Sequence, residues 1–176
     1  MGFGDEKPGR LCPRLEGYDY SSPGRYFVTI ATHDRACLFG EVVNGTMVLS
    51  VEGWAAGFQW ARLSRAFPSV RTDAFQIMPN HVHGIIVLKE HHVYDASWSG
   101  STSALPEARG PTLSEVVRTY KLLVTRMCHE SCKGCCKHWR RIWQRSFWDR
   151  IIRDEEEYEN AVAYIRDNPG RWSQGG

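Results

Sequence analysis

The order of hydrophobic and polar residues along the chain predicts a series of short strands and three helices. Runs of β-branched and aromatic residues are typical of buried strands, and apolar residues that recur every three or four positions are typical of helices. We therefore expect these elements, in chain order: a strand at 26–32, a tight hairpin at 41–49, a helix at about 50–66, strands at about 70–78 and 82–88, a helix at about 112–129, a mixed strand and turn segment at 142–153, and a helix at about 154–167.

Local signals indicate where several of these elements begin and end. Asn44-Gly45 between apolar pairs is a strong signal for a tight hairpin. Thr112 and Glu115 have the spacing of a capping box, which marks the start of a helix. Asn168-Pro169 is expected to stop the last helix, since proline interrupts the helical hydrogen bonds.

The element order predicts the fold class. A strand, a hairpin, a helix, two strands and two further helices indicate an antiparallel sheet with helices packed on it, an α+β fold. A ferredoxin-like arrangement is the nearest common shape. We expect one domain over 23–172, preceded by a flexible leader at 1–22 that is rich in Gly and Pro. Residues 90–110 are expected to form an exposed connection.

Charge and composition exclude some classes of function. The chain has 22 basic and 20 acidic residues, a net charge of +2, so any surface for nucleic acid must be local. No apolar run approaches the ~20 residues that span a bilayer. The first residues lack the apolar segment of a signal peptide, so a cytoplasmic location is expected, with the six cysteines reduced.

Two histidines at the start of a predicted strand are the first candidate site. Side chains alternate across a strand, so His81 and His83 point to one face while Val82 packs on the other. Two imidazoles in this arrangement can bind one divalent metal, Mn²⁺ or Mg²⁺. A His-x-His pair alone is more often only hydrogen-bonded or solvated. Its position after a Met-Pro-Asn turn, where a ligand can reach it, favours a site.

The last predicted helix supplies a second candidate group. Tyr164 and Asn168 are four residues apart and lie on one helix face. Beside the histidines, the Asn168 oxygen would be a third metal ligand and Tyr164 a nucleophile for a phosphodiester. The product would be a covalent phosphotyrosine and a free 3′-hydroxyl. By periodicity alone, Tyr164 is better read as a packing residue.

Several motifs together resemble a known family. The segment 78–83 resembles the HUH motif of single-tyrosine transposases, and the segments 143–149, 152–156 and 164–169 resemble its REP-associated tyrosine transposase subgroup. Arg25 to Thr29, with Leu38-Phe39, is similar to the opening strand of that subgroup. The resemblance covers roughly residues 23–172, and the motifs occur in the family's order.

The resemblance implies a ferredoxin-like domain and a metal-dependent single-stranded DNA endonuclease and strand transferase. It implies that His81, His83 and Asn168 bind Mg²⁺ or Mn²⁺ and that Tyr164 forms a 5′-phosphotyrosine intermediate. Its substrate would be single-stranded DNA with hairpin, palindromic ends, processed by a monomer or a homodimer. The alternative is a domesticated relative that binds such hairpins without cutting them.

Basic residues near the C-terminal third are candidate DNA contacts. Arginines interleave with aromatic residues there, and such a pattern can track a phosphate backbone and stack unpaired bases. Lys121 on the preceding helix could hold a phosphate, although a solvated lysine is as plausible there. The candidates are Lys121, Arg140, Arg141, Arg145 and Arg150.

Two other features compete with this reading. Tyr120 is the rival nucleophile, but its i+4 residue is Val124, which cannot ligate a metal. A cysteine cluster, Cys128, Cys132, Cys135 and Cys136, could bind zinc with His129 and His138, although its spacing is irregular and favours a cysteine-rich loop.

Overall fold

The computed structural model describes residues 17–90, 110–131 and 141–172. Its elements, in chain order, are β1 (Gly24–Ala31), the short helix η1 (His33–Arg35), β2 (Gly40–Val43), β3 (Thr46–Leu49), α1 (Val51–Ala61), α2 (Leu63–Ala66), β4 (Val70–Met78), β5 (His81–Leu88), α3 (Leu113–Ser131), β6 (Trp148–Ile152) and α4 (Glu155–Arg171). None of the helices in these ranges is long and apolar enough to cross a membrane.

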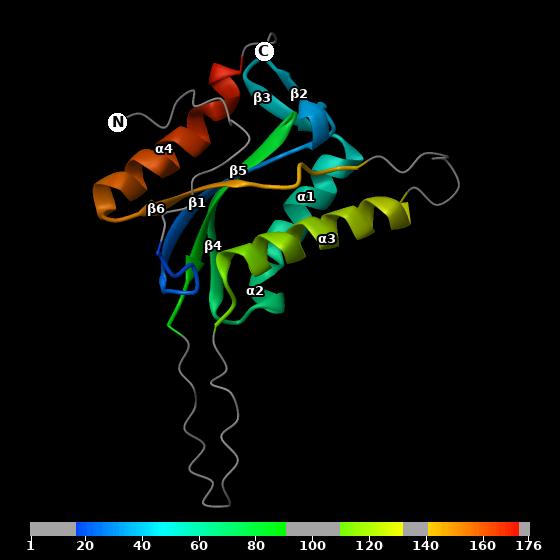
Figure 1. Ribbon diagram of the computed structural model, residues 1–176. Coiled ribbons are helices and arrows are strands. Elements are labelled where there is room, and N and C mark those ends of the chain that lie inside the picture. The colour runs from blue at the N-terminus through cyan, green and yellow to red at the C-terminus, as the bar shows by residue number, and fades with distance from the viewer. Residues whose placement is uncertain (1–16, 91–109, 132–140, 173–176) are drawn as a thin grey trace, which may run out of the picture.

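The fold is built on a four-stranded sheet in the order β4-β5-β1-β6, in which every neighbouring pair is antiparallel. Helices α1 and α3 cover one face of the sheet, and α4 crosses the other (Figure 1). Strands β1, β4, β5 and β6, joined through α1 and α3, have the order of a ferredoxin-like fold. The predicted α+β class is confirmed.

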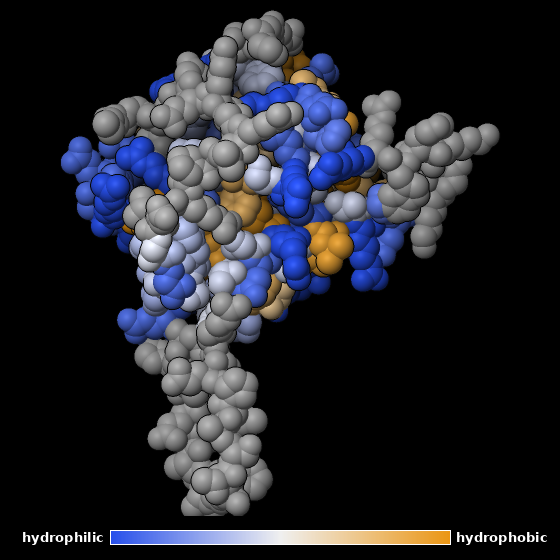
Figure 2. Space-filling view, in the orientation of Figure 1, coloured by the Kyte–Doolittle hydropathy of each residue, from blue (hydrophilic) through white to orange (hydrophobic). Residues whose placement is uncertain are grey.

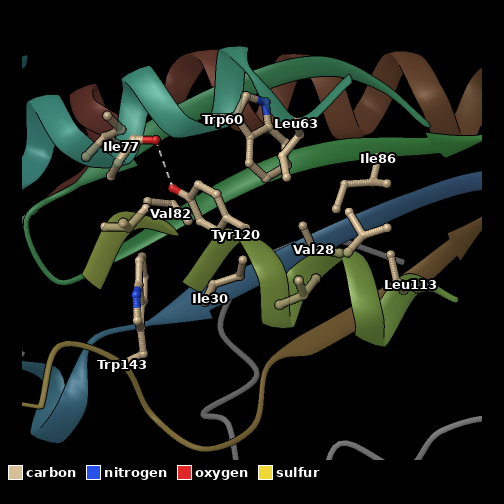
Figure 3. Packing of buried hydrophobic residues seen from close by; sticks show 14 of the residues in the cluster. Val28, Ile30, Trp60, Leu63, Ile77, Val82, Ile86, Leu113, Tyr120 and Trp143 are labelled. Carbon is tan, nitrogen blue, oxygen red and sulfur yellow. Dashed lines mark hydrogen bonds between the residues drawn. The ribbon is translucent and has the colours of Figure 1, made fainter. Parts of the chain in front are cut away.

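Alternation along β1 and β5 divides the core into two parts. Val28, Ile30 and Val82 face α1 and α3, where Tyr120 and Trp143 complete the larger cluster (Figure 3). The intervening side chains pack against α4, and this second cluster contains Phe27, Ile85, Ile152, Ala161 and Ile165. His81 and His83 alternate with Val82 along β5 and therefore point to the same face as Ile85. This is the face of the sheet that α4 covers.

Most predicted boundaries are confirmed. Asn44 and Gly45 have φ of 51° and 74°, as the tight hairpin between β2 and β3 requires. The capping box forms: the Thr112 amide donates to Glu115 Oε2 at 2.8 Å, and the Glu115 amide donates to Thr112 Oγ1 at 3.2 Å. The helix expected at 50–66 is interrupted at Arg62, which separates α1 from α2.

The expected end of the last helix is wrong. Helix α4 continues through Asn168 and Pro169 to Arg171. Pro169 removes one hydrogen bond, that to the carbonyl of Ile165, but both side chains are buried and hold the turn in place. Tertiary packing thus outweighs the local stop signal, and Trp172 closes the helix by donating its amide to the Pro169 carbonyl at 3.3 Å.

Gly84 lies where β5 passes under the indole of Trp60. A Cβ at this position would clash with Trp60 Cζ2, and the stacking of this ring on Phe75, with centroids 4.4 Å apart, restricts its movement. We expect Gly84→Ala to lower the free energy of unfolding by about 1–3 kcal/mol, measured by chemical denaturation. Gly170→Ala in α4 is the matched control, since no atom lies within 4 Å of its added methyl. Equal stability of both variants would contradict this packing.

Candidate active site

The two histidines meet at the start of β5. His81 Nε2 lies 2.9 Å from His83 Nε2, so the two rings converge on one point. Both side chains are almost fully covered, with 8% and 5% exposed. The expected strand geometry is confirmed, with Val82 buried on the opposite face. Aromatic rings from α4 and its C-cap lie against the pair, at the place where the sequence led us to expect access for a ligand.

Hydrogen bonds from neighbouring residues orient both imidazoles. His81 Nδ1 lies 2.6 Å from Asn80 Oδ1, a carbonyl oxygen that can only accept, so His81 Nδ1 carries the proton. His83 Nδ1 lies 2.8 Å from Thr29 Oγ1, which stands directly across from it on β1. Phe27 stacks on the His83 ring with centroids 5.4 Å apart. These partners leave the two Nε2 atoms directed at each other.

Burial keeps both imidazoles neutral. It lowers the pKa of His81 to about 4, with a smaller contribution from the positive charge of Arg35. Burial also lowers the pKa of His83 well below its usual value, helped by His81 and Arg35. A neutral imidazole has one ring nitrogen with a free lone pair, and it is the form that binds a metal.

The depressed pKa values predict how the metal-free protein responds to acid. In the unfolded chain His81 is protonated as the pH falls below 6.5, whereas in the folded protein its imidazole stays neutral until about pH 4. Stability is therefore fully present at neutral pH and falls as the pH drops through this window. For His81 alone we expect a loss of about 2 kcal/mol between pH 7 and pH 5, measured by urea denaturation with a chelator present. His81→Gln should flatten this dependence, and an unchanged slope would contradict it.

Helix α4 is fastened to the sheet by polar contacts at its N-terminal half. Asp154 caps it, accepting from the Glu157 amide at 2.8 Å. Tyr158 donates to Asp73 on β4 at 2.9 Å, and the Arg25 guanidinium of β1 lies 4.5 Å from the Tyr158 ring centre. These contacts span the sheet and fix the direction in which the rest of the helix crosses it.

The C-terminal half of α4 brings the predicted nucleophile to the histidines. The Tyr164 ring lies 5.3 Å from the His83 ring, and the Trp172 ring lies 6.0 Å from the His81 ring. Asn168 is four residues from each, one helical turn away in either direction and on the same side of α4. Helix α4, which was expected to stop at Asn168, therefore extends past both histidines.

The donor set fits a small divalent metal. Two nitrogens 2.9 Å apart match the edge of an octahedron, which is about 3.0 Å long for metal–ligand bonds of about 2.1 Å. Among the described residues, no group of three or more His, Cys, Asp and Glu side chains could hold a metal. The Asn168 carboxamide remains the predicted third ligand.

The rival nucleophile is a core residue. Tyr120 is 0% exposed, and its hydroxyl donates to the Ala56 carbonyl at 3.1 Å. Burial raises its pKa well above the usual value. Its side chain points toward α1 (Figure 3). It belongs to the core cluster on the face of the sheet opposite that of the histidines. Cys128 is also buried in this cluster, and the remaining cysteines of the predicted zinc group lie outside the described residues.

The predicted DNA contacts have different surroundings. Lys121 donates to the carbonyls of Gln144 and Ser146, both at 2.9 Å, so its ammonium holds the segment before β6. Burial, with a contribution from Arg141, lowers its pKa to about 8. Arg150 forms an ion pair with Glu157 at 3.1 Å. Arg141 and Arg145 are exposed, and Arg140 lies outside the described residues.

Known proteins are similar to this chain in fold and in sequence. No protein-family model matches the chain. A solved REP-associated tyrosine transposase bound to a REP hairpin has the same fold, with a TM-score of 0.58, 22% identity, and 90% of this chain and 73% of that chain covered. An uncharacterized Haemophilus influenzae protein is 36% identical over 168 residues, 94% of this chain and 91% of its own length.

A second Haemophilus influenzae protein is named as a REP-associated tyrosine transposase, and it is 24% identical over 156 residues, 86% of this chain and 73% of its own length. The chain belongs to the REP-associated tyrosine transposase family. The transposase family that the sequence motifs indicated is thus confirmed.

Four residues around the transposase's histidines were not predicted as part of the site. They are Phe27, Thr29, Asn80 and Trp172. Asn80 could have been found from its place next to His81. Thr29 requires the register of β1 against β5, and Trp172 requires knowing that α4 continues past Pro169, so neither has a local signal in the sequence.

Proposed function

We propose that this transposase nicks and rejoins single-stranded DNA with hairpin ends through a 5′-phosphotyrosine at Tyr164. The main support is that α4 places Tyr164 beside His83 and its C-cap Trp172 lies beside His81, with Asn168 four residues from each along the chain. A tyrosine on a helix is ordinarily a packing residue. Next to two convergent, neutral imidazoles, it has the surroundings of a nucleophile in a metal site.

His81, His83 and Asn168 would hold the metal, Mg²⁺ or Mn²⁺. When bound, the metal would polarise the scissile phosphate and stabilise the charge that develops on its oxygens. The protein orients its ligands beforehand, since Asn80 and Thr29 bond the Nδ1 atoms and turn both Nε2 atoms toward one point. Arg35, whose charge acts on both imidazoles, adds positive potential at the same end of the sheet.

The phenol of Tyr164 performs the strand exchange. Its Oη forms a bond to the scissile phosphorus as the bond from phosphorus to the 3′ oxygen breaks. The phenolic proton passes to solvent, and the leaving oxygen becomes a free 3′-hydroxyl. The phosphotyrosine keeps the energy of the phosphodiester, so attack by a 3′-hydroxyl reverses the step and rejoins a strand.

The hairpin substrate is proposed from the family. The solved relative of the same fold is bound to a REP hairpin. On this chain, Arg141 and Arg145 are the exposed arginines that precede β6 and are available to phosphates. Lys121 and Arg150 serve the protein's own structure through their bonds to Gln144, Ser146 and Glu157.

The direct test is formation of a covalent complex. Labelled single-stranded hairpin DNA, incubated with the protein and Mn²⁺ or Mg²⁺, should become attached to the chain and survive denaturing electrophoresis. A chelator should prevent attachment without releasing bound hairpin in a native gel. Binding without any attachment, at every metal tested, would instead identify a protein that recognises hairpins and does not cut them.

The hydrogen bond between Thr29 and His83 predicts a measurable effect on the metal. Thr29→Val keeps the shape of the side chain but removes the partner of His83 Nδ1. We expect affinity for Mn²⁺, measured without DNA by electron paramagnetic resonance, to fall about 10- to 100-fold. Thr46→Val, on the exposed side of β3, is the matched control and should bind Mn²⁺ like the parent. Equal affinity in Thr29→Val would remove Thr29 from the site.

A further inference from the structure

Helix α1 presents an unusual outward face. Trp54 is 69% exposed and Phe58 is 48% exposed, although large aromatic side chains are normally placed inside. They are four residues apart, so they lie one above the other on the helix. Val51, 61% exposed, precedes them on the same side. This outward face, with Arg62 and Arg65 beyond it, is called the α1 stripe below.

The stripe does not belong to the core. The opposite face of α1 already packs through Ala55, Ala56 and Trp60, and Tyr120 from α3 bonds the Ala56 carbonyl. In Figure 3, the Trp60 indole points from α1 toward the sheet, away from the outward face. Trp54 and Phe58 thus remain largely outside the core that the described residues form.

Basic residues continue the line of aromatic ones. The Arg62 guanidinium lies 5.1 Å from the centre of the Phe58 ring, and Arg65 follows in α2. Both arginines are exposed, and neither has an ion pair with another described residue. Exposed aromatic faces followed by unpaired cations suit a partner with flat rings and a negatively charged backbone. Single-stranded DNA has both, whereas an apolar protein partner would leave the arginines uncompensated.

The stripe begins near the candidate active site. The Ser50 amide, at the N-cap of α1, donates to the Phe39 carbonyl at 2.9 Å. The Phe39 amide donates in turn to the carbonyl of Pro79, two residues before His81, at 3.0 Å. Two backbone hydrogen bonds therefore join the start of α1 to the turn that precedes the histidines. Trp54 stands in the first turns of that helix, at the same end of the sheet.

We propose that the α1 stripe binds a single-stranded DNA segment that extends from the hairpin, with one base stacked on Trp54 and another on Phe58. Arg62 and Arg65 contact the phosphates of this segment. The stripe lies on α1, on the side of the sheet opposite α4, so it is a second DNA contact distinct from the cleavage site. The inference rests on the proposed DNA substrate, but not on Tyr164 as nucleophile.

The stacking is tested with variants that separate aromatic from merely apolar contact. Affinity for an unpaired oligothymidine and for a hairpin with a single-stranded extension is measured by fluorescence anisotropy. Trp54→Leu should weaken both about fivefold to a hundredfold, whereas Trp54→Tyr should keep most of the affinity. Leu122→Ala, at a 65% exposed apolar residue of α3, is the control and should bind like the parent. Full binding by Trp54→Leu would overturn the proposal.

Two further measurements distinguish the alternatives. Hairpin DNA whose extension contains 5-iodouracil should photocrosslink to Trp54 or Phe58, located by mass spectrometry; crosslinks confined to other residues would overturn the proposal. Analytical ultracentrifugation of Trp54→Leu should match the parent. If the parent is a dimer and Trp54→Leu is a monomer, the stripe joins two copies of the chain instead. If the parent protein binds oligothymidine but forms no covalent adduct, the result would contradict the assignment of Tyr164 as nucleophile and leave the α1 stripe proposal standing.

Discussion

Tyr164→Phe abolishes the covalent protein–DNA complex and leaves hairpin binding intact, if the proposed chemistry is correct. The substitution removes only the phenolic oxygen that attacks phosphorus, and we expect the rate of adduct formation to fall by about 10⁴-fold or more. The phenyl ring keeps its contacts with His83 and Phe27, whose centroids lie 5.3 Å and 5.9 Å from that of Tyr164. The fold should therefore persist. The measurement is single-turnover adduct formation on denaturing gels, with binding followed in parallel.

Two other tyrosines provide controls of the same chemical change. Tyr158→Phe, six residues earlier in α4, loses the hydrogen bond to Asp73 but keeps the ring beside the Arg25 guanidinium, so α4 should stay in place and the adduct should form at nearly the parental rate. Tyr120→Phe loses the bond to the Ala56 carbonyl and about 1 kcal/mol of stability, again without loss of the adduct. An adduct that persists in Tyr164→Phe, or that disappears only in Tyr120→Phe, would show that the nucleophile is wrongly assigned.

Replacing both histidines should have the second largest effect. His81→Ala His83→Ala removes two nitrogens that converge at 2.9 Å, and with them the metal that would activate the phosphate. We expect adduct formation to fall about 10³-fold or more, since a bound metal contributes several kcal/mol of transition-state stabilisation. Hairpin binding should change little, because the exposed arginines near β6 remain. The rate is measured across a Mn²⁺ titration.

His33→Ala is the matched control for the histidine pair. His33 lies in η1, and its ring contacts Asp34 at 3.0 Å rather than the other imidazoles. Its replacement should leave the metal dependence unchanged. Cleavage by the double variant at the parental rate would exclude the pair from the chemistry, whereas slow cleavage rescued by higher Mn²⁺ would show that further ligands retain the ion.

Local chemistry made much of the fold predictable. The Asn44-Gly45 turn and the Thr112–Glu115 capping box each form as expected, because each is determined by a few neighbouring residues. The common face of His81 and His83 follows from the two-residue period of a strand, which holds in any register. Tyr164 and Asn168 share a side of α4 for the same kind of reason.

Contacts between residues far apart in the chain determined the length of α4 and the surroundings of His83 and Lys121. Pro169 is a stop signal in the sequence, yet α4 continues because Ile165 and Pro169 are buried against the sheet. Thr29 becomes a partner of His83 only through the register of β1 against β5. Lys121 was as plausible on the surface as in a phosphate site, and the structure places its ammonium on two backbone carbonyls instead.

The sequence by itself determined the element order, the α+β class and a pair of histidines able to share a metal. These follow from periodicity and turn chemistry, which act over a few residues. Only the tertiary structure decided that α4 lies over that pair, that its rings cover it, and that Tyr120 is excluded by burial in the core. The physical reason is that the position of a helix on a sheet depends on the summed packing of residues far apart in the chain. Here Arg25 and Asp73, on two strands of the sheet, both contact Tyr158 of α4.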